Sequence, residues 1–443
     1  MTNQSLKHYF IRTYGCQMNE LDTEIMAGQL KRKGLSPTDN EDLADLVIFN
    51  TCSIRDLAER KVMGKLGQLG RRKKKQIIGV TGCMAMAKKE ALFRKFPHLD
   101  FVVGTNNITD LENVLDEVLY SQKQILKTDD RFEENLDYLG AERGNKVKSF
   151  ISIIRGCDKF CTYCVVPYTR GQEVSRPPQS IIDEAKHLAD QGIKEITLLG
   201  QNVNSYGKDQ PSWNMLFHDL MYNLDKINGI DRIRFMTSHP IDITIGLMQA
   251  IRDLPSLCEF VHFPIQAGSS RILKKMHRIY TKEIYFEKVE LLRSIIPNVK
   301  LGTDIIVGFP TETEEEFLET YKALEEIRYS LAFLYTYSPR KGTPAMRWKD
   351  DVPEEVKADR LRKLTDLQNK INQEDMQTYL GKTVEVLVER LNKDGKLYGR
   401  TSCFRKVIFE GDKSLVGTLQ KVKIHSFCHQ TFLGTQAPLL QAV

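Results

Sequence analysis

The sequence lacks any long hydrophobic run. No uninterrupted apolar stretch approaches the ~18 residues that a membrane-spanning helix needs, and the first seven residues are mostly polar. We therefore expect a soluble, cytoplasmic protein without a secretory signal and without a membrane partner. Internal repeats and long low-complexity tracts are missing as well. At 443 residues, the chain is long enough for roughly three domains of ~150 residues, each with its own core.

Cysteine is present in an odd number, nine residues, which does not suit a framework of paired disulfides. Reducing compartments also keep thiols reduced. We therefore interpret the cysteines as metal ligands, catalytic thiols or core residues.

The first part of the chain alternates strand-like and helix-like patterns. Runs rich in Val, Ile and Phe occur at 8–14, 46–50, 76–80 and 101–103, and helical spacing of apolar residues occurs at 21–33, 54–69, 87–96 and 110–120. This alternation predicts an α/β domain over 7–120, with a parallel sheet covered by helices. The polar, charged stretch 121–147 is predicted to be a linker.

A second alternating series predicts a central domain over 148–376. Its strand candidates are 150–154, 195–199, 232–236, 260–263, 300–307 and 331–335. Six strand–helix units favour an open (β/α)6 partial TIM barrel over a closed eightfold one. The pattern then changes to short strands at 382–389, 396–402, 405–410 and 420–426, with hairpin signals at Asn392-Lys-Asp-Gly395 and Glu410-Gly-Asp412. We expect a small all-β barrel over 377–443.

Three lone cysteines occupy equivalent places in the first domain. Cys16, Cys52 and Cys83 each follow a predicted strand by a few residues and precede a predicted helix. Because the carboxyl ends of parallel strands share one edge, the three should converge there, and the helix starts should favour thiolates. The alternative is three unrelated core residues. A structural zinc would need four ligands, whereas a 4Fe-4S cluster on three cysteines leaves one iron open; the spacing by itself does not decide the metal.

Clustered cysteines form the most specific motif in the chain. Cys157, Cys161 and Cys164 have the spacing CxxxCxxC directly after the first strand of the second series. Such a loop can hold three corners of a cubane, and the fourth iron can then chelate S-adenosylmethionine for one-electron cleavage to a 5′-deoxyadenosyl radical. Zinc is the alternative, but no fourth Cys or His follows at knuckle spacing. Tyr163, before the last cysteine, occupies an aromatic position typical of radical S-adenosylmethionine enzymes.

Polar residues gather near the later strands of the second series, where the carboxyl face of such a barrel forms its active site. Glu195, Gln266 and Gly308 are therefore candidates for cofactor binding, although each could instead form a turn or a salt bridge. No conventional acid–base pair is predicted beyond the cluster ligands.

Taken together, these features resemble the methylthiotransferase family of radical S-adenosylmethionine enzymes over essentially the whole chain. The motifs that carry the resemblance are Thr13-Tyr-Gly-Cys-Gln-Met-Asn19, 155–171 around the clustered cysteines, and Leu199-Gly-Gln-Asn-Val-Asn-Ser-Tyr206. They are similar to the branch that inserts a methylthio group at C2 of N6-dimethylallyladenosine beside the anticodon of tRNA. The branch that modifies a ribosomal-protein aspartate typically has Pro-Lys where this chain has Gln17-Met18, and it is the second candidate.

The resemblance implies roles for individual residues. Cys157, Cys161 and Cys164 would hold the radical-generating 4Fe-4S cluster, Cys16, Cys52 and Cys83 would hold an auxiliary 4Fe-4S cluster, and the backbone at Tyr163 would lie by the adenine of S-adenosylmethionine. The last domain would be a TRAM domain. An electron donor and a sulfur source are implied but not identified, and we expect a monomer. Two positions depart from the family pattern, Met86 and Arg155.

The C-terminal segment is basic. From residue 380 onwards the chain has 10 Lys or Arg and 5 Asp or Glu. The resemblance to a TRAM domain indicates RNA binding through phosphate contacts. The candidate residues are Lys382, Arg390, Lys396, Arg400, Arg405, Lys406, Lys421 and Lys423. A non-catalytic RNA-binding protein with structural metal sites is the third hypothesis.

Overall fold

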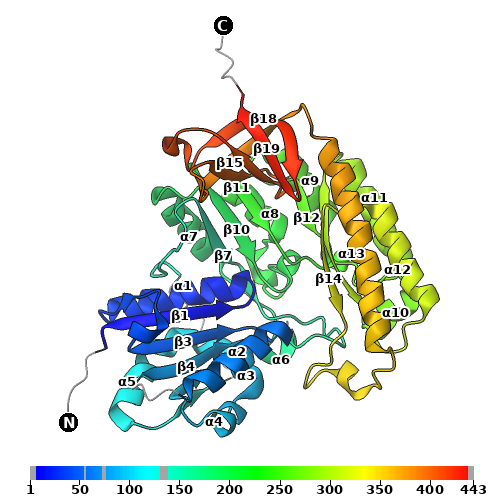
Figure 1. Ribbon diagram of the computed structural model, residues 1–443. Helices are drawn as coiled ribbons and strands as arrows, with labels where there is room; N and C mark the ends of the chain where they lie inside the picture. The colour runs from blue at the N-terminus through cyan, green and yellow to red at the C-terminus, as the bar shows by residue number, and fades with distance from the viewer. Residues whose placement is uncertain (1–5, 54–55, 72–75, 130–137, 438–443) are drawn as a thin grey trace. The chain divides into compact units, whose positions relative to one another are not determined.

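The computed structural model describes residues 6–53, 56–71, 76–129 and 138–437, and its contacts divide the chain into two compact units (Figure 1). The first unit comprises the chain up to 144 together with 154–160 and 164–176. The second comprises 145–153, 161–163 and everything from 177 onwards. In the described residues, no helix is both long and apolar enough to cross a membrane.

The first unit is built on a parallel sheet of six strands in the described residues, in the order β2-β1-β3-β4-β5-β6. The strands are β1 (His8–Tyr14), β2 (Ser36–Pro37), β3 (Leu46–Thr51), β4 (Ile77–Gly82), β5 (Phe101–Val103) and β6 (Ile125–Lys127). Every residue of β3 is buried, as its run of Leu, Val, Ile and Phe requires of a strand covered on both faces. The predicted parallel α/β sheet is thus confirmed.

Helices cover both faces of this sheet. α1 (Gln17–Arg32) and α5 (Leu111–Ser121) pack together on one face, and α2 (Asp56–Leu69), α3 (Cys83–Lys88) and α4 (Ala91–Lys95) belong to the other. The core on the second side joins Val47 and Phe49 of β3 to Leu66 of α2 and Met84 of α3. Full burial of a side chain of this size contributes about 1.5–3 kcal/mol to the stability of the fold. This packing holds α3 against the sheet at the edge where β4 ends.

The segment 121–147 is more ordered than the predicted linker. It supplies β6, which pairs in parallel with β5, and Arg143 in its second half forms an ion pair with Glu24 at 3.1 Å. Its polar composition hid these contacts because the partners lie far away in the sequence. Residues 130–137 of the predicted linker are outside the described part.

The second unit contains the predicted partial barrel. Its parallel strands form two sheets, β11-β10-β7 and β12-β13-β14, and a parallel bridge between Ile233 and Leu257 joins their neighbouring edges. The strands are β7 (Lys148–Ser152), β10 (Glu195–Leu199), β11 (Arg232–Phe235), β12 (Phe260–His262), β13 (Lys300–Val307) and β14 (Leu331–Thr336). These six strands, all within the described residues, match the predicted positions closely.

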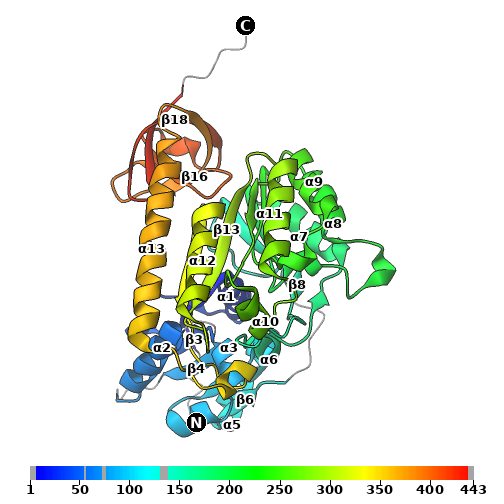
Figure 2. The same cartoon turned by 90° about the vertical axis from the view of Figure 1, so that its right-hand side faces the viewer.

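Helices between these strands and after the last of them accompany the sheets. They are α7 (Pro178–Asp190), α8 (Phe217–Asp225), α9 (Ile245–Asp253), α10 (Ser270–Lys275), α11 (Lys282–Ile295), α12 (Glu314–Ile327) and α13 (Glu354–Gln377). α12 begins with a capping box, in which the Glu316 amide donates to Thr313 Oγ1 at 3.3 Å and the Thr313 amide donates to Glu316 Oε2 at 3.0 Å. α13 leads directly into the last strands (Figure 2).

The last strands close into a small barrel in the order β15-β16-β17-β19-β18, as predicted for an all-β domain. They are β15 (Thr383–Leu391), β16 (Leu397–Arg400), β17 (Lys406–Phe409), β18 (Leu419–Cys428) and β19 (Thr431–Gln436), and we call them the C-terminal barrel. Val386, Val407, Val422 and Phe432 lie among its buried core residues. Residues 438–443 of the predicted domain lie outside the described part.

One hairpin prediction in this barrel is wrong. Asn392-Lys-Asp-Gly395 does join the antiparallel pair β15 and β16, but Glu410-Gly-Asp412 does not connect neighbouring strands. β17 instead pairs in parallel with β19, and β18 closes the barrel against β15. The Gly-Asp turn signal is local, whereas barrel closure is set by strands that meet across the fold.

Candidate functional site

The three lone cysteines of the first unit lie at one edge of its sheet. β1, β3 and β4 are neighbours, and their last residues are in register, with Tyr14 opposite Thr51 and Thr51 opposite Gly82. The cysteines follow these positions by one or two residues. The structure therefore brings together Cys16, Cys52 and Cys83, which are spread over 68 positions of the sequence.

Two of these cysteines are preceded by a glycine, because a neighbouring asparagine side chain lies too close to leave room for a Cβ atom. A Cβ on Gly15 would lie 2.3 Å from Asn19 Oδ1, and one on Gly82, whose φ is +88°, would lie 2.6 Å from Asn50 Oδ1. A larger residue at either position would displace an asparagine that supports the turn. The Gly-Cys pairs in the sequence are thus explained by packing.

Two buried asparagines hold the cysteine-bearing turns. Asn19 Nδ2 donates to Asn50 Oδ1 at 3.0 Å, and Asn50 Nδ2 donates to the Asn19 carbonyl at 2.7 Å. The Cys16 amide in turn donates to Asn19 Oδ1 at 3.3 Å. Sequence reasoning missed Asn50, although an asparagine inside an otherwise apolar strand is a recognisable exception to strand composition.

The electrostatic surroundings favour a thiolate at Cys16. Its pKa is lowered to about 6, chiefly by a hydrogen bond from the Cys52 side chain, while burial opposes this and the charge of Arg170 assists. Burial raises the pKa of Cys83, and Arg170 again acts in the opposite direction. The two cysteines therefore share one guanidinium as a neighbour.

Arg170 belongs to a buried group of three charges in the first unit. It ends α6 (Val166–Arg170), and its Nη2 donates to Asp22 of α1 at 2.9 Å. Arg155 Nη2 donates to the other oxygen of the same carboxylate at 2.8 Å. Asp22 is completely buried, and its single carboxylate pairs with both guanidiniums. This explains the departure at Arg155 noted in the sequence, because the side chain has a carboxylate partner.

The donor set at this edge suits an anionic cluster. Sulfur ligands, a lowered pKa at one of them and the nearby charge of Arg170 all favour thiolates of the kind that bind iron. In the described residues, no three or more His, Cys, Asp or Glu side chains are arranged to hold a single metal ion.

The clustered cysteines are positioned by local backbone contacts. In the first unit, the Cys157 amide donates to the Gly171 carbonyl at 3.1 Å, and Cys164 Sγ accepts from the Val166 amide at 3.5 Å. A Cβ at Gly156 would lie 1.8 Å from the Gln172 carbonyl oxygen, so the glycine before Cys157 has no substitute. In the second unit, Cys161 is buried and its Sγ accepts from Arg278 Nη1 at 3.5 Å.

Three of the predicted cofactor residues, Gln266, Gly308 and Tyr163, belong to the second unit. Each lies directly after β13 or in contact with a residue of that region. Gln266 makes a parallel bridge with Ile305, and its φ is +72°, an unfavourable value for a residue other than glycine. Gly308 directly follows β13, has a φ of +68° and donates from its amide to Glu312. The ring of Tyr163 contacts Phe309 edge-on, with centroids 6.4 Å apart.

Glu195 is placed differently from the prediction. It is the first residue of β10, at the amino end of the strand, and its carboxylate accepts from Arg234 Nε at 2.8 Å. Arg400 of the C-terminal barrel lies 3.6 Å away. Arg234 also donates to the carbonyls of Thr401 and Ser402. The geometry assigns Glu195 to the contact between the two parts of this unit, and it does not support a cofactor contact.

Six of the eight basic residues predicted to bind RNA are exposed on the C-terminal barrel. They are Lys382, Arg390, Lys396, Lys406, Lys421 and Lys423. The other two are engaged within the protein: Arg405 is buried and pairs with Asp375, and half-buried Arg400 pairs with Glu389. These two ion pairs give Arg400 and Arg405 a structural role.

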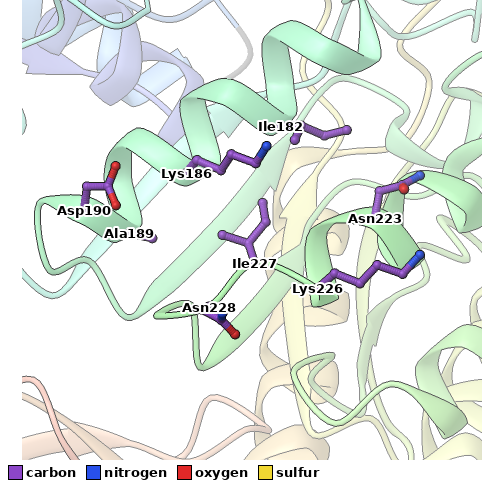
Figure 3. A pocket seen from close by; sticks show the side chains of 8 residues that line it. All are labelled: Ile182, Lys186, Ala189, Asp190, Asn223, Lys226, Ile227 and Asn228. Atoms are coloured by element: carbon purple, nitrogen blue, oxygen red, sulfur yellow. The ribbon is translucent and has the colours of Figure 1, made fainter.

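A surface pocket of about 440 Å³ lies elsewhere in the second unit, between α7 and α8 (Figure 3). Lys186 and Asp190 of α7 line one side, and Asn223 of α8 and Lys226 line the other. None of its eight lining residues is a cysteine or a predicted cofactor residue. We therefore do not assign the chemistry to this pocket.

Comparison with protein families divides the chain into three matches. Residues 8–104 match the family described as "Uncharacterized protein family UPF0004", 151–324 match the radical SAM superfamily, and 377–433 match the TRAM domain.

Similar curated proteins share one name, tRNA-2-methylthio-N(6)-dimethylallyladenosine synthase. The protein from Protochlamydia amoebophila is 68% identical over 97% of this chain and 96% of its own length. That from Thermoanaerobacter pseudethanolicus is 49% identical over 94% and 90%, and that from Clostridium botulinum 47% identical over 95% of both chains.

Solved structures with a similar fold are more distant. The radical S-adenosylmethionine methyltransferase TsrM from Kitasatospora setae has a TM-score of 0.55 at 13% identity, with 77% of this chain and 75% of that chain covered. The cobalamin-dependent radical enzyme OxsB has a TM-score of 0.51 at 15% identity, covering 83% and 56%. At these identities, the likeness shows the fold alone.

Proposed function

The chain belongs to the family of tRNA-2-methylthio-N(6)-dimethylallyladenosine synthases, and from that membership we propose how its residues serve the reaction. The enzyme is a transferase with a radical SAM domain. It inserts a methylthio group at C2 of N6-dimethylallyladenosine beside the anticodon of tRNA. The main structural support for this proposal is that Cys16, Cys52 and Cys83 all lie at one edge of the first unit's sheet.

Two sets of three cysteines hold two 4Fe-4S clusters in this proposal. Cys157, Cys161 and Cys164 take the radical-generating cluster, and Cys16, Cys52 and Cys83 take the auxiliary cluster through which sulfur is supplied. Each set leaves one iron without a protein ligand. When bound, the first cluster would supply the electron that cleaves S-adenosylmethionine to a radical. Radical chemistry is needed because an unactivated aromatic C–H bond has no useful acidity, so a base could not remove its proton.

The protein's own residues set the positions of these groups. Asn19 and Asn50 hold the turn of Cys16 through buried hydrogen bonds. The Tyr163 backbone, Gln266 and Gly308 form the S-adenosylmethionine site in this proposal, and both Gln266 and Gly308 have a left-handed backbone. The charge of Arg170 favours a thiolate at Cys16 in the first unit.

The RNA partner binds the exposed lysines and Arg390 of the C-terminal barrel through its phosphates. Tyr398 packs under the Arg390 guanidinium, whose Cζ lies 4.6 Å from the ring centroid. A flat cationic surface of this kind suits RNA. The electron donor and the sulfur source are separate partners, and the chain acts as a monomer.

Nucleoside mass spectrometry of tRNA tests the function. In a strain that lacks the gene and has no second enzyme of this activity, the 2-methylthio modification should disappear and the N6-dimethylallyl precursor should accumulate. The wild-type gene should restore it, and a Cys16→Ala gene should not. Undiminished modification in the deletion strain would refute the proposal. A mass change on a ribosomal protein instead would favour the branch that acts on an aspartate.

A further inference from the structure

Arg278 is a buried arginine whose neighbours are neutral groups. Its side chain lies just after α10 and is 7% exposed. Nε donates to Tyr280 Oη at 2.9 Å, Nη2 donates to the Pro264 carbonyl at 3.2 Å, and Nη1 donates to Cys161 Sγ at 3.5 Å. The guanidinium is thus held on three sides by a phenol, a carbonyl and a thiol.

The absence of a carboxylate partner sets Arg278 apart within the described residues. The other buried arginines there all form ion pairs: Arg155 and Arg170 with Asp22, Arg232 with Glu385, Arg234 with Glu195, Arg360 with Glu312, and Arg405 with Asp375. In the described part of the chain, the Arg278 guanidinium has no such pair. A buried charge without a counter-charge is strongly unfavourable, so a negative group should occupy the space beside it.

Tyr280 does not supply that charge. Its hydroxyl accepts from Arg278 and lies 3.1 Å from the carbonyls of both Pro264 and Ile265, to which it can donate. Burial raises the pKa of Tyr280 to about 12, which keeps the phenol neutral. The tyrosine instead fixes the guanidinium plane, and it leaves Nη1 directed at Cys161.

We propose that Arg278 is the counter-charge of the radical-generating cluster and a positioning residue that sets its reduction potential through Cys161. This inference rests on the proposed function. A cubane held by three thiolates is an anion that becomes more negative on reduction. A fixed cation at a ligand sulfur therefore stabilises the reduced state and raises the potential. A hydrogen bond to that sulfur has the same sign of effect.

The test uses a single-cluster variant of the full chain, in which Cys16, Cys52 and Cys83 are all replaced by alanine. Into it we introduce Arg278→Gln, which removes the charge, and Arg278→Lys, which keeps it. Arg232→Lys is the matched control, since Arg232 is also buried but pairs with Glu385. The measurements are iron and sulfide content, the electron paramagnetic resonance spectrum of the reduced cluster, and its midpoint potential by redox titration.

Arg278→Gln should make reduction of the cluster at least tenfold less favourable, which is a fall of ~59 mV for one electron. Arg278→Lys should recover part of this shift but alter the spectrum, because an ammonium cannot donate to Cys161, Tyr280 and Pro264 in one plane. Arg232→Lys should change neither quantity. An unchanged potential in an iron-loaded Arg278→Gln protein would overturn the inference.

If Arg278→Gln does not fold, Arg278→Lys decides the matter: an unchanged spectrum with full iron content would overturn the inference, and an altered one would support it. The parent variant separates this question from the proposed function. A parent that binds no iron–sulfur cluster refutes both, whereas a parent with a normal cluster and an unmoved potential in the variants refutes only the role of Arg278.

Discussion

Arg170 donates a hydrogen bond to the carboxylate of Asp22 at 2.9 Å, and both side chains are buried. Asp22 lies on the helix that begins after Cys16, and Arg170 ends the helix that begins after Cys164. The pair therefore joins the segment behind a lone cysteine to the segment behind a clustered one, within a single unit of the structure.

Asp22→Asn should destabilise this unit strongly. The change removes the buried carboxylate with which both Arg155 and Arg170 pair, and breaking a buried ion pair in this way costs about 3–5 kcal/mol. Urea denaturation of the variant should show the loss in free energy of unfolding. Glu24→Gln is the control, because the Glu24–Arg143 pair is partly exposed and should matter less. Equal losses in the two variants would contradict the interpretation.

Cys16→Ala should abolish sulfur insertion and leave radical cleavage of the cofactor at least partly intact. The substitution removes one ligand of the auxiliary cluster but none of the other set. Product formation is measured on tRNA by nucleoside mass spectrometry, and cleavage is measured as 5′-deoxyadenosine. Cys428→Ala is the control, since Cys428 is exposed on the C-terminal barrel. Normal yield of the methylthiolated nucleoside would remove Cys16 from the ligand set.

Iron content should divide between the two cysteine sets. Anaerobically purified protein should contain about eight iron atoms and a similar amount of acid-labile sulfide per chain if both clusters are present. Replacing Cys16, Cys52 and Cys83 together should reduce both by about half. Metal analysis that finds zinc in place of iron would support the non-catalytic RNA-binding alternative.

Acid should weaken the attachment of the C-terminal barrel through Glu195. Burial alone would raise the pKa of this carboxyl, but Arg234 and Arg400 outweigh it and lower the pKa below the ordinary value of 4.5. The stabilisation is therefore complete above pH 4.5 and is lost as the pH falls through the lower folded-state value. Thermal unfolding between pH 3 and 6, roughly the range around that ordinary value, should show this dependence.

Glu195→Gln provides the comparison for this pH experiment. The variant should be less stable than the wild type at neutral pH, because Arg234 loses its counter-charge. Its stability should also vary less with pH below 4.5. A wild type and a variant with the same acid dependence would show that other groups are responsible.

Exposed lysines of the C-terminal barrel should contribute to tRNA affinity through phosphate contacts. Lys421→Gln and Lys423→Gln should each weaken binding and reduce the slope of log affinity against log salt by about 1. Filter binding over a range of KCl concentrations measures the slope. Lys226→Gln is the control, since Lys226 lies at the pocket between α7 and α8. A loss equal to that of the control would argue against an RNA surface here.

Local patterns in the sequence were sufficient for much of the architecture. Apolar runs predicted β1, β3, β4 and β5 of the first unit but not β2 or β6, and they predicted the strands of the two parallel sheets of the second unit. A strand that is buried on both faces must be continuously apolar. The same rhythm placed Cys16, Cys52 and Cys83 at one edge, since parallel strands joined by helices all end on the same side. The CxxxCxxC spacing is likewise local, and it needed no distant residue to be interpreted.

Tertiary structure alone decided which charges are paired. From the sequence, Glu195 was a candidate for cofactor binding. In the structure its carboxylate forms ion pairs with Arg234 and Arg400, which lie 39 and 205 residues later in the sequence. The same holds for the strand order of the C-terminal barrel, where β19 enters between β17 and β18.

The sequence by itself determined the two sets of cysteines and the rhythm of strands and helices, because spacing and periodicity are properties of neighbouring residues. Only the tertiary structure decided that Asp22 serves two arginines and that Arg278 lies against Cys161 without a carboxylate among its described neighbours. The physical reason is burial. The energy of a charge depends on what surrounds it in space, and those surroundings come from segments that are far apart along the chain.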